Sequence, residues 1–236
     1  ALYDGEIRRL DQLFFKRLRE TLQALALDRN TLVIVSADHG EELAERGLVG
    51  HVSTYREGRL YDEVIRIPLL LWFPGVIKKG VVIDDLVQNI DIVPTVLDLL
   101  DLRKPVALPG QSLMPLIDGR GGWRQRPVFL ETSAGGYTAN QEQYKRRYRA
   151  VRTERWKLVH SVSEEEFALY DLATDPHEME DVESEFPAVV DSLRTQLHRW
   201  SFASQPQQVG AREAAGVGEG VLSSFFLLLF DVPGQS

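Results

Sequence analysis

The chain has 236 residues, of which 44% are hydrophobic and none is cysteine, and its 27 basic and 35 acidic residues give a formal net charge of −8. This length predicts one large domain, or one medium domain plus a small one. The missing cysteines exclude a disulfide framework, a thiolate metal site and a cysteine nucleophile within these residues. The acidic balance argues against a nucleic-acid-binding protein, and the apolar runs are too short for a membrane span.

The first part of the chain predicts a helix followed by buried strands. Apolar residues spaced by three and four form one helical face, made of Ile7, Leu10, Phe14, Leu18, Leu22 and Leu25. The nearly continuous apolar run at 31–36 is typical of a strand that is central in a parallel sheet and covered on both faces. A second buried strand is predicted at 67–72, with Pro68 confined to its first part.

A second helix is predicted at 92–101, with Asp91 as its N-cap and Pro94 in its first turn. Beyond the glycine-rich boundary at 119–122 the pattern changes to short strands, with a hairpin turn at 153–154. These strands are predicted at 128–131, 148–152, 156–160 and 168–172, before a last amphipathic helix at 186–200. This order predicts an α/β core with a small α+β lobe, formed by an antiparallel sheet and one helix.

Three regions follow from this pattern. Residues 1–120 form part of the α/β core, 121–203 form the lobe, and 204–236 form a tail that we expect to be poorly ordered. The tail ends in an apolar stretch at 222–230. This stretch fits either a strand that covers a sheet edge or a non-native translation product.

Asp38 and His39 directly follow the first buried strand. In open α/β sheets, sites form outside the carboxyl ends of strands, so a carboxylate and an imidazole here are candidate ligands of a divalent metal. The same position also fits a helix cap, because Glu41 and Glu42 are able to begin a helix and Gly40 permits a tight turn. Two ligands are too few for such a metal, so others would have to come from elsewhere.

Among the remaining histidines, His51 is the functional candidate, since it lies between Gly50 and Val52 in a predicted loop. It fits either a surface residue or a group that donates a proton or a hydrogen bond to an anion. The other histidines are interpreted as lobe structure (His160) or as surface residues (His177 and His198). Lys78 and Lys79 are interpreted as a solvated turn.

Seven segments, in this order, together resemble the sulfatase family of the alkaline phosphatase-like superfamily. They are YDGEIRRLDQLFFKRL, TLVIVSADHGEEL, LYDEVIRIPLLLWFPG, VQNIDIVPTVLDLLDL, PGQSLMPLIDG, RAVRTERWKLV and LYDLATDPHEMEDV. No single segment is decisive, but together they cover nearly everything from about 2 to 200. The resemblance is to the C-terminal half of such an enzyme, and it implies a partial alkaline phosphatase-like sandwich core.

The resemblance implies roles for four residues. Asp38 and His39 match the family's late metal-ligand pair, so the implied cofactor is a divalent cation, most commonly calcium. An imidazole ligand shifts the expectation toward Mn, Mg or Zn, because hard calcium sites prefer oxygen. His51 falls near a basic residue that contacts the sulfate and its ester oxygen, which implies a catalytic and substrate-binding role. Arg46 replaces a histidine of the family pattern and is an alternative contact for the anion.

The family's nucleophile, a formylglycine made from Cys or Ser in a C/S-x-P-S/A-R motif, has no counterpart in this sequence. We therefore expect the chain to be a fragment of a sulfuric ester hydrolase that lacks the nucleophile half and is inactive in isolation. A phosphate or phosphonate ester hydrolase of the same superfamily and a non-catalytic module are the alternatives. The expected partners are a sulfate ester and either a second copy or the missing N-terminal half, with no nucleic acid.

Overall fold

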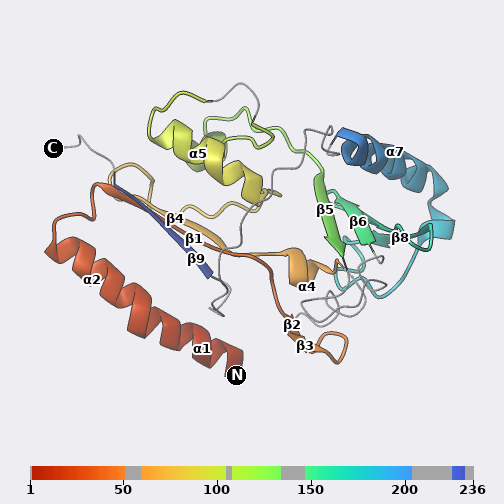
Figure 1. Ribbon diagram of the computed structural model, residues 1–236, viewed down its shortest axis with the longest axis horizontal. Coiled ribbons are helices and arrows are strands. Elements are labelled where there is room, and N and C mark those ends of the chain that lie inside the picture. The colour runs from red at the N-terminus through yellow and green to blue at the C-terminus, as the bar shows by residue number, and fades with distance from the viewer. Residues whose placement is uncertain (1, 51–59, 105–107, 134–146, 204–224, 232–236) are drawn as a thin grey trace, which may run out of the picture.

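This computed structural model describes residues 2–50, 60–104, 108–133, 147–203 and 225–231. Two halves lie side by side (Figure 1). In one half, a small sheet lies between a long N-terminal helix and helix α5; in the other, helix α7 covers a second sheet. No helix in these ranges is both long and apolar enough to cross a bilayer.

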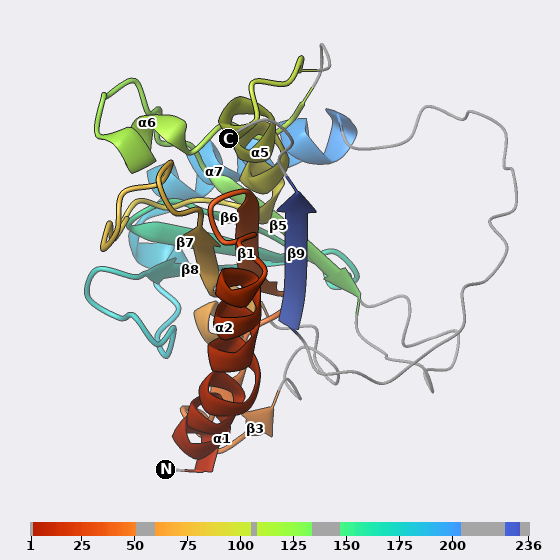
Figure 2. The same cartoon turned by 90° about the vertical axis from the view of Figure 1, so that its left-hand side faces the viewer.

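The N-terminal helix is continuous but changes type along its length. It consists of α1 (Leu2–Leu10), the π-helical η1 (Asp11–Phe15) and α2 (Lys16–Ala24). Figure 2 shows it running along one face of β1. Of the predicted apolar face, Leu22 is buried, whereas Ile7 and Leu25 remain 49% and 62% exposed. Phe14 is exposed as well, so half of the six residues of this face lie at the surface.

The first sheet has the order β4-β1-β9, built from β1 (Thr31–Ala37), β4 (Leu69–Trp72) and β9 (Phe225–Asp231). The predicted parallel neighbours of the first strand are wrong, because β1 pairs antiparallel with both β4 and β9. An apolar run records burial on both faces but not strand direction, which explains the error. Strand β9 pairs along all of β1, from Thr31 opposite Asp231 to Ala37 opposite Phe225.

Helix α5 (Ile92–Leu99) follows the 3₁₀ turn η2 (Asn89–Asp91) and packs on the sheet. Its Val96 joins Leu32 and Ile34 of β1 and Phe73 in one buried cluster. Asp91 stands at the N-cap position of α5, as predicted, but its side chain makes no capping bond to that helix. Instead its carboxylate accepts hydrogen bonds from the backbone N–H groups of Gln88 and Gln111, which ties the loop before α6 (Met114–Asp118) to η2.

The lobe is a four-stranded antiparallel sheet of order β5-β6-β7-β8, as the alternating patterns predict. Its strands are β5 (Val128–Ser133), β6 (Arg147–Arg152), β7 (Trp156–Ser161) and β8 (Glu166–Asp171). The predicted hairpin turn is confirmed, because Thr153 N–H donates to the carbonyl of Trp156 at 2.8 Å. The 3₁₀ turn η4 (Glu183–Glu185) then leads into α7 (Pro187–Ala203).

The two faces of the lobe sheet bury different neighbours. Helix α7 covers one face, where Val190, Leu193 and Leu197 pack on Val151, Leu158 and Leu169. The other face includes Ala150, Val159 and Tyr170 and packs against Leu60 and Ile65, from the segment that precedes β4. Alternate residues of each strand thus point to opposite sides. This second face joins the lobe to the half that carries Asp38 and His39.

Candidate functional site

Asp38 and His39 lie in the loop that leaves the carboxyl end of β1. The backbone N–H of His39 donates to Asp38 Oδ1 at 3.0 Å, and His39 Nδ1 lies 2.8 Å from the carbonyl oxygen of Gly40. A carbonyl can only accept, so this contact places a proton on Nδ1. His39 Nε2 lies 3.8 Å from Asp38 Oδ2.

The alternative interpretation of Asp38 as a helix cap is wrong. Residues 42–43 form the short strand β2 (Glu42–Leu43), which pairs antiparallel with β3 (Val49–Gly50). No helix begins after Gly40 in the described part of this loop, and the Asp38 carboxylate bonds the neighbouring N–H of His39 instead.

Gly40 is required by close packing rather than by a tight turn. Its N–H donates to the carbonyl of Val64 at 2.6 Å, in helix α4 (Asp62–Ile65). A Cβ at Gly40 would lie 2.1 Å from the carbonyl oxygen of Glu63 and 2.7 Å from that of Arg66. Only glycine lets the loop approach the backbone of α4 this closely.

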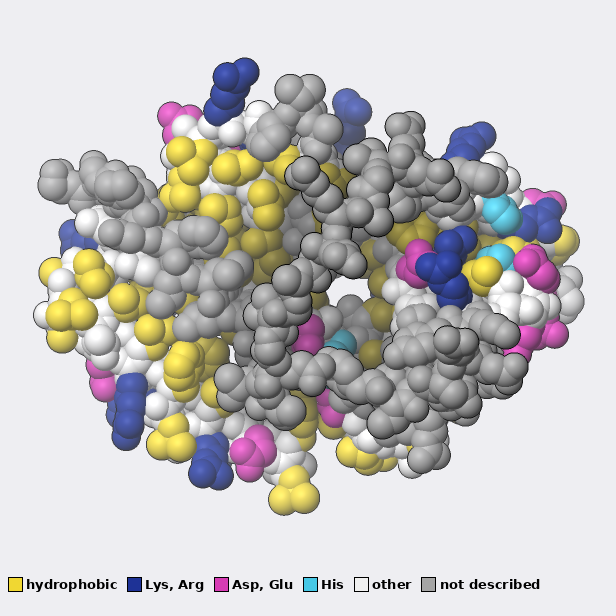
Figure 3. Space-filling model, viewed as in Figure 1, with side chains coloured by type: hydrophobic (Ala, Val, Ile, Leu, Met, Phe, Trp, Pro, Cys, Tyr) yellow, Lys and Arg dark blue, Asp and Glu magenta, His cyan; other side chains and the backbone are white. Residues whose placement is uncertain are grey.

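Asp38 and His39 line an open cleft of about 2030 Å³ between the two halves. Figure 3 shows the hollow, with acidic and histidine side chains visible inside it. The residues that line this cleft also include Glu131, Arg126 and Arg152. Among the described residues, no group of three or more histidine or acidic side chains is able to hold a metal ion. Asp38 and His39 therefore have no third acidic or histidine side chain grouped with them among the described residues, and their role as metal ligands stays a prediction.

A buried charge cluster that the sequence reasoning missed lies where α4 meets the lobe; we define it as Asp62, Arg152, Lys157 and Glu178. Arg152 grips the Asp62 carboxylate through Nε at 3.1 Å and Nη2 at 2.8 Å. Lys157, with no exposed surface, bonds Asp62 Oδ1 at 3.0 Å and Glu178 Oε1 at 2.8 Å. Two cations balance two carboxylates, which is the condition for burying such charges.

The two acids of the charge cluster respond oppositely to their surroundings. Burial by itself would raise the pKa of Asp62, but the hydrogen bond from Arg152 and the charge of Lys157 outweigh it and hold that pKa below its ordinary value. Burial raises the pKa of Glu178, and Lys157 offsets only part of this effect. Glu178 also adopts a left-handed backbone (φ 55°), an uncommon conformation for a residue other than glycine. Local strain and charge burial thus coincide at Glu178.

The comparisons with known proteins place these segments in one family. The family model described as N-sulphoglucosamine sulphohydrolase, C-terminal, matches residues 50–202. The chain belongs to the sulfatase family. The predicted resemblance to the C-terminal half of such enzymes is confirmed, because the matched domain is the C-terminal one. Asp38 and His39 lie outside the matched range.

Curated sulfatases show the same relationship. Arylsulfatase K of Rattus norvegicus is 30% identical over 82% of this chain and 35% of its own length, and that of Homo sapiens is 32% identical over 75% and 32%. N-acetylglucosamine-6-O-sulfatase of Bacteroides thetaiotaomicron is 28% identical over 70% and 29%. The chain spans about a third of the length of these relatives.

Solved structures confirm the alkaline phosphatase-like fold class. A 2-O GAG sulfatase superposes with a TM-score of 0.66 at 25% identity, covering 85% of this chain and 43% of that one. A phosphonate monoester hydrolase from Silicibacter pomeroyi also superposes with a TM-score of 0.66 at 25% identity, covering 82% and 39%. The partial coverage of both neighbours agrees with a sulfatase segment.

Arg46, a candidate anion contact of the sulfatase segment, already has protein partners. Its Nη1 donates to Glu63 Oε2 at 3.0 Å, and its guanidinium lies 3.4 Å from the centre of the Tyr61 ring. Burial would raise the pKa of Glu63, but hydrogen bonds from His177 and Arg46 and from its own backbone lower it overall. Arg46 would have to leave Glu63 to bind sulfate, so its role as an anion contact stays a prediction.

The histidines fall in different places. His51 lies outside the described residues, so its predicted role has no geometry to test it. His160 is buried in the lobe and stacks on Phe167, with ring centres 4.3 Å apart. His177, interpreted as a surface residue, is 62% exposed, but its Nδ1 lies 3.1 Å from Glu63 Oε1. The ring centre of the exposed His198 lies 6.2 Å from that of His160.

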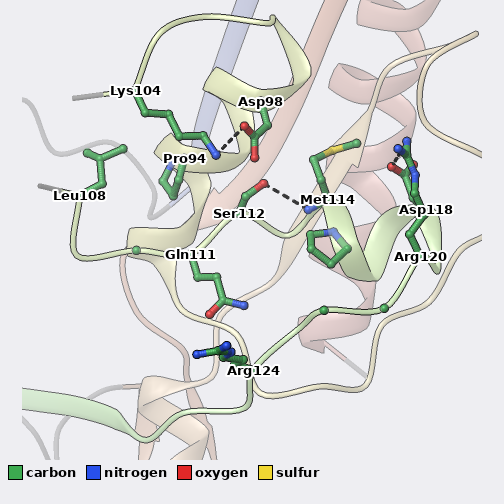
Figure 4. Close-up of a pocket in the computed structure, with 14 residues that line it drawn as sticks. Pro94, Asp98, Lys104, Leu108, Gln111, Ser112, Met114, Asp118, Arg120 and Arg124 are labelled. Carbon is green, nitrogen blue, oxygen red and sulfur yellow. Dashed lines mark hydrogen bonds and ion pairs between the residues drawn. The ribbon is translucent and has the colours of Figure 1, made fainter. Parts of the chain in front are cut away.

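A second, smaller pocket of about 680 Å³ lies beside α5 and α6 (Figure 4). Lys104 and Arg120 line it, but each is paired within the pocket, with Asp98 at 2.5 Å and Asp118 at 2.6 Å. Arg124 lines it as well. Neither Asp38 nor His39 lines it, so this pocket is separate from the candidate metal ligands.

Proposed function

We propose that this chain supplies the Asp38–His39 metal-ligand pair of a sulfuric ester hydrolase. The observation that carries the proposal is the hydrogen bond from His39 Nδ1 to Gly40, which aims Nε2 at the same region as the Asp38 carboxylate. A carboxylate and an imidazole so arranged suit a divalent cation. Calcium is the cation we propose first, with Mn, Mg or Zn as alternatives, because one ligand is nitrogen.

When bound, the cation would stabilise negative charge on the sulfate oxygens and on the nucleophile. Asp38 supplies negative charge to hold the cation, and His39 supplies a ring that the Gly40 carbonyl keeps in one tautomer. Both side chains leave the end of a buried strand, so little rearrangement is needed to bind. We propose His51 as the donor of a proton or hydrogen bond to the leaving ester oxygen, with Arg46 as the alternative anion contact.

Asp38→Asn is expected to weaken Mn²⁺ binding to the chain about tenfold or more, because it removes the only full negative charge of the pair. Isothermal titration calorimetry with MnCl₂ and with CaCl₂, at pH 7, measures this change in the dissociation constant. Asp28→Asn, before the opposite end of β1, makes the same change of charge and is expected to bind as the unaltered chain does. Equal affinity in Asp38→Asn and the unaltered chain would contradict the proposal.

The isolated chain is expected to hydrolyse no 4-nitrophenyl sulfate, with or without CaCl₂. The reason is chemical: the sequence has no cysteine and no C/S-x-P-S/A-R segment from which a formylglycine nucleophile could form. A complete sulfatase assayed in the same buffer is the positive control. Metal-dependent release of 4-nitrophenol by the purified chain would overturn this expectation and would require a nucleophile among the residues present.

A phosphonate monoester hydrolase is the second candidate function. The superposition on such an enzyme, with the same TM-score as the sulfatase, supports it. The Asp38–His39 pair serves either chemistry, since both reactions place negative charge on oxygens beside a cation. The ratio of rates on a phosphonate monoester and on a sulfate ester, measured on a protein that contains this segment together with a nucleophile, decides between them.

We propose in addition that the chain associates through its N-terminal helix. Leu2, Ile7, Leu13 and Phe14 are between 43% and 91% exposed there, and exposed apolar side chains favour association. The occupant is either a second copy or the remaining part of a sulfatase. Light scattering of the purified chain distinguishes a monomer from an oligomer.

A further inference from the structure

Helix α4 is a short link between the lobe and the Asp38–His39 loop. It has four residues, fewer than a helix needs to be stable by its own hydrogen bonds. Its position therefore depends on what contacts it from either side. One side meets the charge cluster, and the other meets Gly40.

On the lobe side, the charge cluster holds the first residue of α4 by backbone and side chain together. Asp62 N–H donates to Glu178 Oε1 at 2.7 Å. The Asp62 carboxylate accepts from Arg152 and from Lys157. Lys157 joins both acids and has no exposed surface, so water is poorly placed to replace it. Removing its charge would leave two buried carboxylates facing a single cation.

On the loop side, contacts with α4 and with its C-cap residue Arg66 define where Gly40 lies. The Val64 carbonyl accepts the Gly40 N–H at 2.6 Å. The carbonyl oxygens of Glu63 and Arg66 occupy the space where a Cβ of Gly40 would be. The Gly40 carbonyl in turn contacts His39 Nδ1 at 2.8 Å. A shift of α4 therefore reaches the imidazole through one hydrogen-bonded residue.

We propose that the charge cluster positions the Asp38–His39 loop through α4, with Lys157 as the central positioning residue. The role of this positioning in metal binding rests on the proposed function. The contacts that join the charge cluster to Gly40 through α4 do not depend on a bound metal. Arg46 and His177 form a parallel link, since both contact Glu63 of α4. That second link is more exposed, with His177 at 62%, and solvent screens it more strongly.

Lys157→Met tests the link in the whole chain through single-residue amide hydrogen exchange at pH 7 without metal. Gly40 N–H is expected to exchange at least tenfold faster than in the unaltered chain. Arg155→Gln is the control, because Arg155 also pairs with a carboxylate of the lobe, that of Asp171, but forms no hydrogen bond or ion pair with α4 within the described part of the chain. Gly40 exchange in this control is expected to stay within twofold.

A second pair of variants keeps the test decisive if Lys157→Met fails to fold. Glu178→Ala removes the acceptor of Asp62 N–H and is expected to accelerate Gly40 exchange in the same way. Glu178→Gln retains an oxygen at that place and is expected to restore most of the protection. Equal acceleration in Glu178→Ala and Glu178→Gln, or equal acceleration in Lys157→Met and Arg155→Gln, would overturn the proposal, and so would no acceleration at all.

Metal titration separates this proposal from the function on which it rests. If Asp38→Asn leaves MnCl₂ binding unchanged, the metal function fails, but the exchange result still decides the positioning role. If Asp38 is required for binding, Lys157→Met is expected to weaken Mn²⁺ affinity about tenfold, whereas Arg155→Gln does not. Normal affinity in a folded Lys157→Met chain would contradict the positioning of the ligand pair.

Discussion

Gly40→Ala is expected to lower the free energy of unfolding by about 2–3 kcal/mol, the usual cost of overpacking a tight contact. The added Cβ would lie 2.1 Å from the carbonyl oxygen of Glu63 and 2.7 Å from that of Arg66. Both neighbours are backbone atoms, so no side chain is able to swing away. The loop has to leave α4, and the hydrogen bond from Gly40 N–H to Val64 is lost with it.

Urea unfolding, followed by circular dichroism, measures this loss. The control is Gly5→Ala on the exposed surface of α1, where nothing beyond the adjoining helix backbone lies within 4 Å of the added Cβ. Alanine is expected to stabilise that helix by about 0.5–1 kcal/mol relative to glycine. If Gly40→Ala unfolds at the same urea concentration as the unaltered chain, the close approach of the loop to α4 is not the reason for this glycine.

Asp91→Asn is expected to cost about 3 kcal/mol, because it leaves a buried donor without an acceptor and breaks an ion pair. The Asp91 carboxylate has no exposed surface and accepts from Gln88 N–H at 2.9 Å and Gln111 N–H at 2.8 Å. It also pairs with Arg126. An amide in its place points its NH₂ group at one of these donors, and it carries no charge for the guanidinium.

The matched control is Asp118→Asn, in which the same change of atoms is made at the surface. Asp118 pairs with Arg120, whose side chain is 79% exposed, and such pairs contribute at most about 1 kcal/mol. Thermal and urea unfolding of both variants measure the contrast. A cost at Asp91 no larger than at Asp118 would show that the loop joining Gly110–Gln111 to η2 contributes little to stability.

The lobe could be predicted from sequence in most of its elements, because its information is local. Successive residues of each strand point alternately to the face covered by α7 and to the face that meets the other half. This period of two is visible in residues that are neighbours in the sequence. The hairpin turn at Thr153 depends on a contact with Trp156, three residues away. Such short-range patterns predict local structure without knowledge of the rest of the fold.

The site could be predicted only in part. The position of Asp38 and His39 could be predicted, because they directly follow the apolar run at 31–36 that indicates a buried strand. The role of Gly40 was not, because the carbonyl groups that exclude a side chain belong to Glu63 of α4 and to the following Arg66, far along the chain. The partners of the Asp91 side chain are not predictable for the same reason, because Gln111 is 20 residues away and Arg126 is 35 residues away.

Length, charge and the absence of cysteine excluded classes of protein, and the ordered segments indicated the family. Local periodicity determined the elements themselves, because each is encoded by residues a few positions apart. Only the tertiary structure decided the antiparallel pairing of β1 and the charge cluster, in which Asp62 meets Arg152, Lys157 and Glu178 across 90, 95 and 116 residues. Contacts at such separations depend on how the chain folds back, which no local pattern of residue types records.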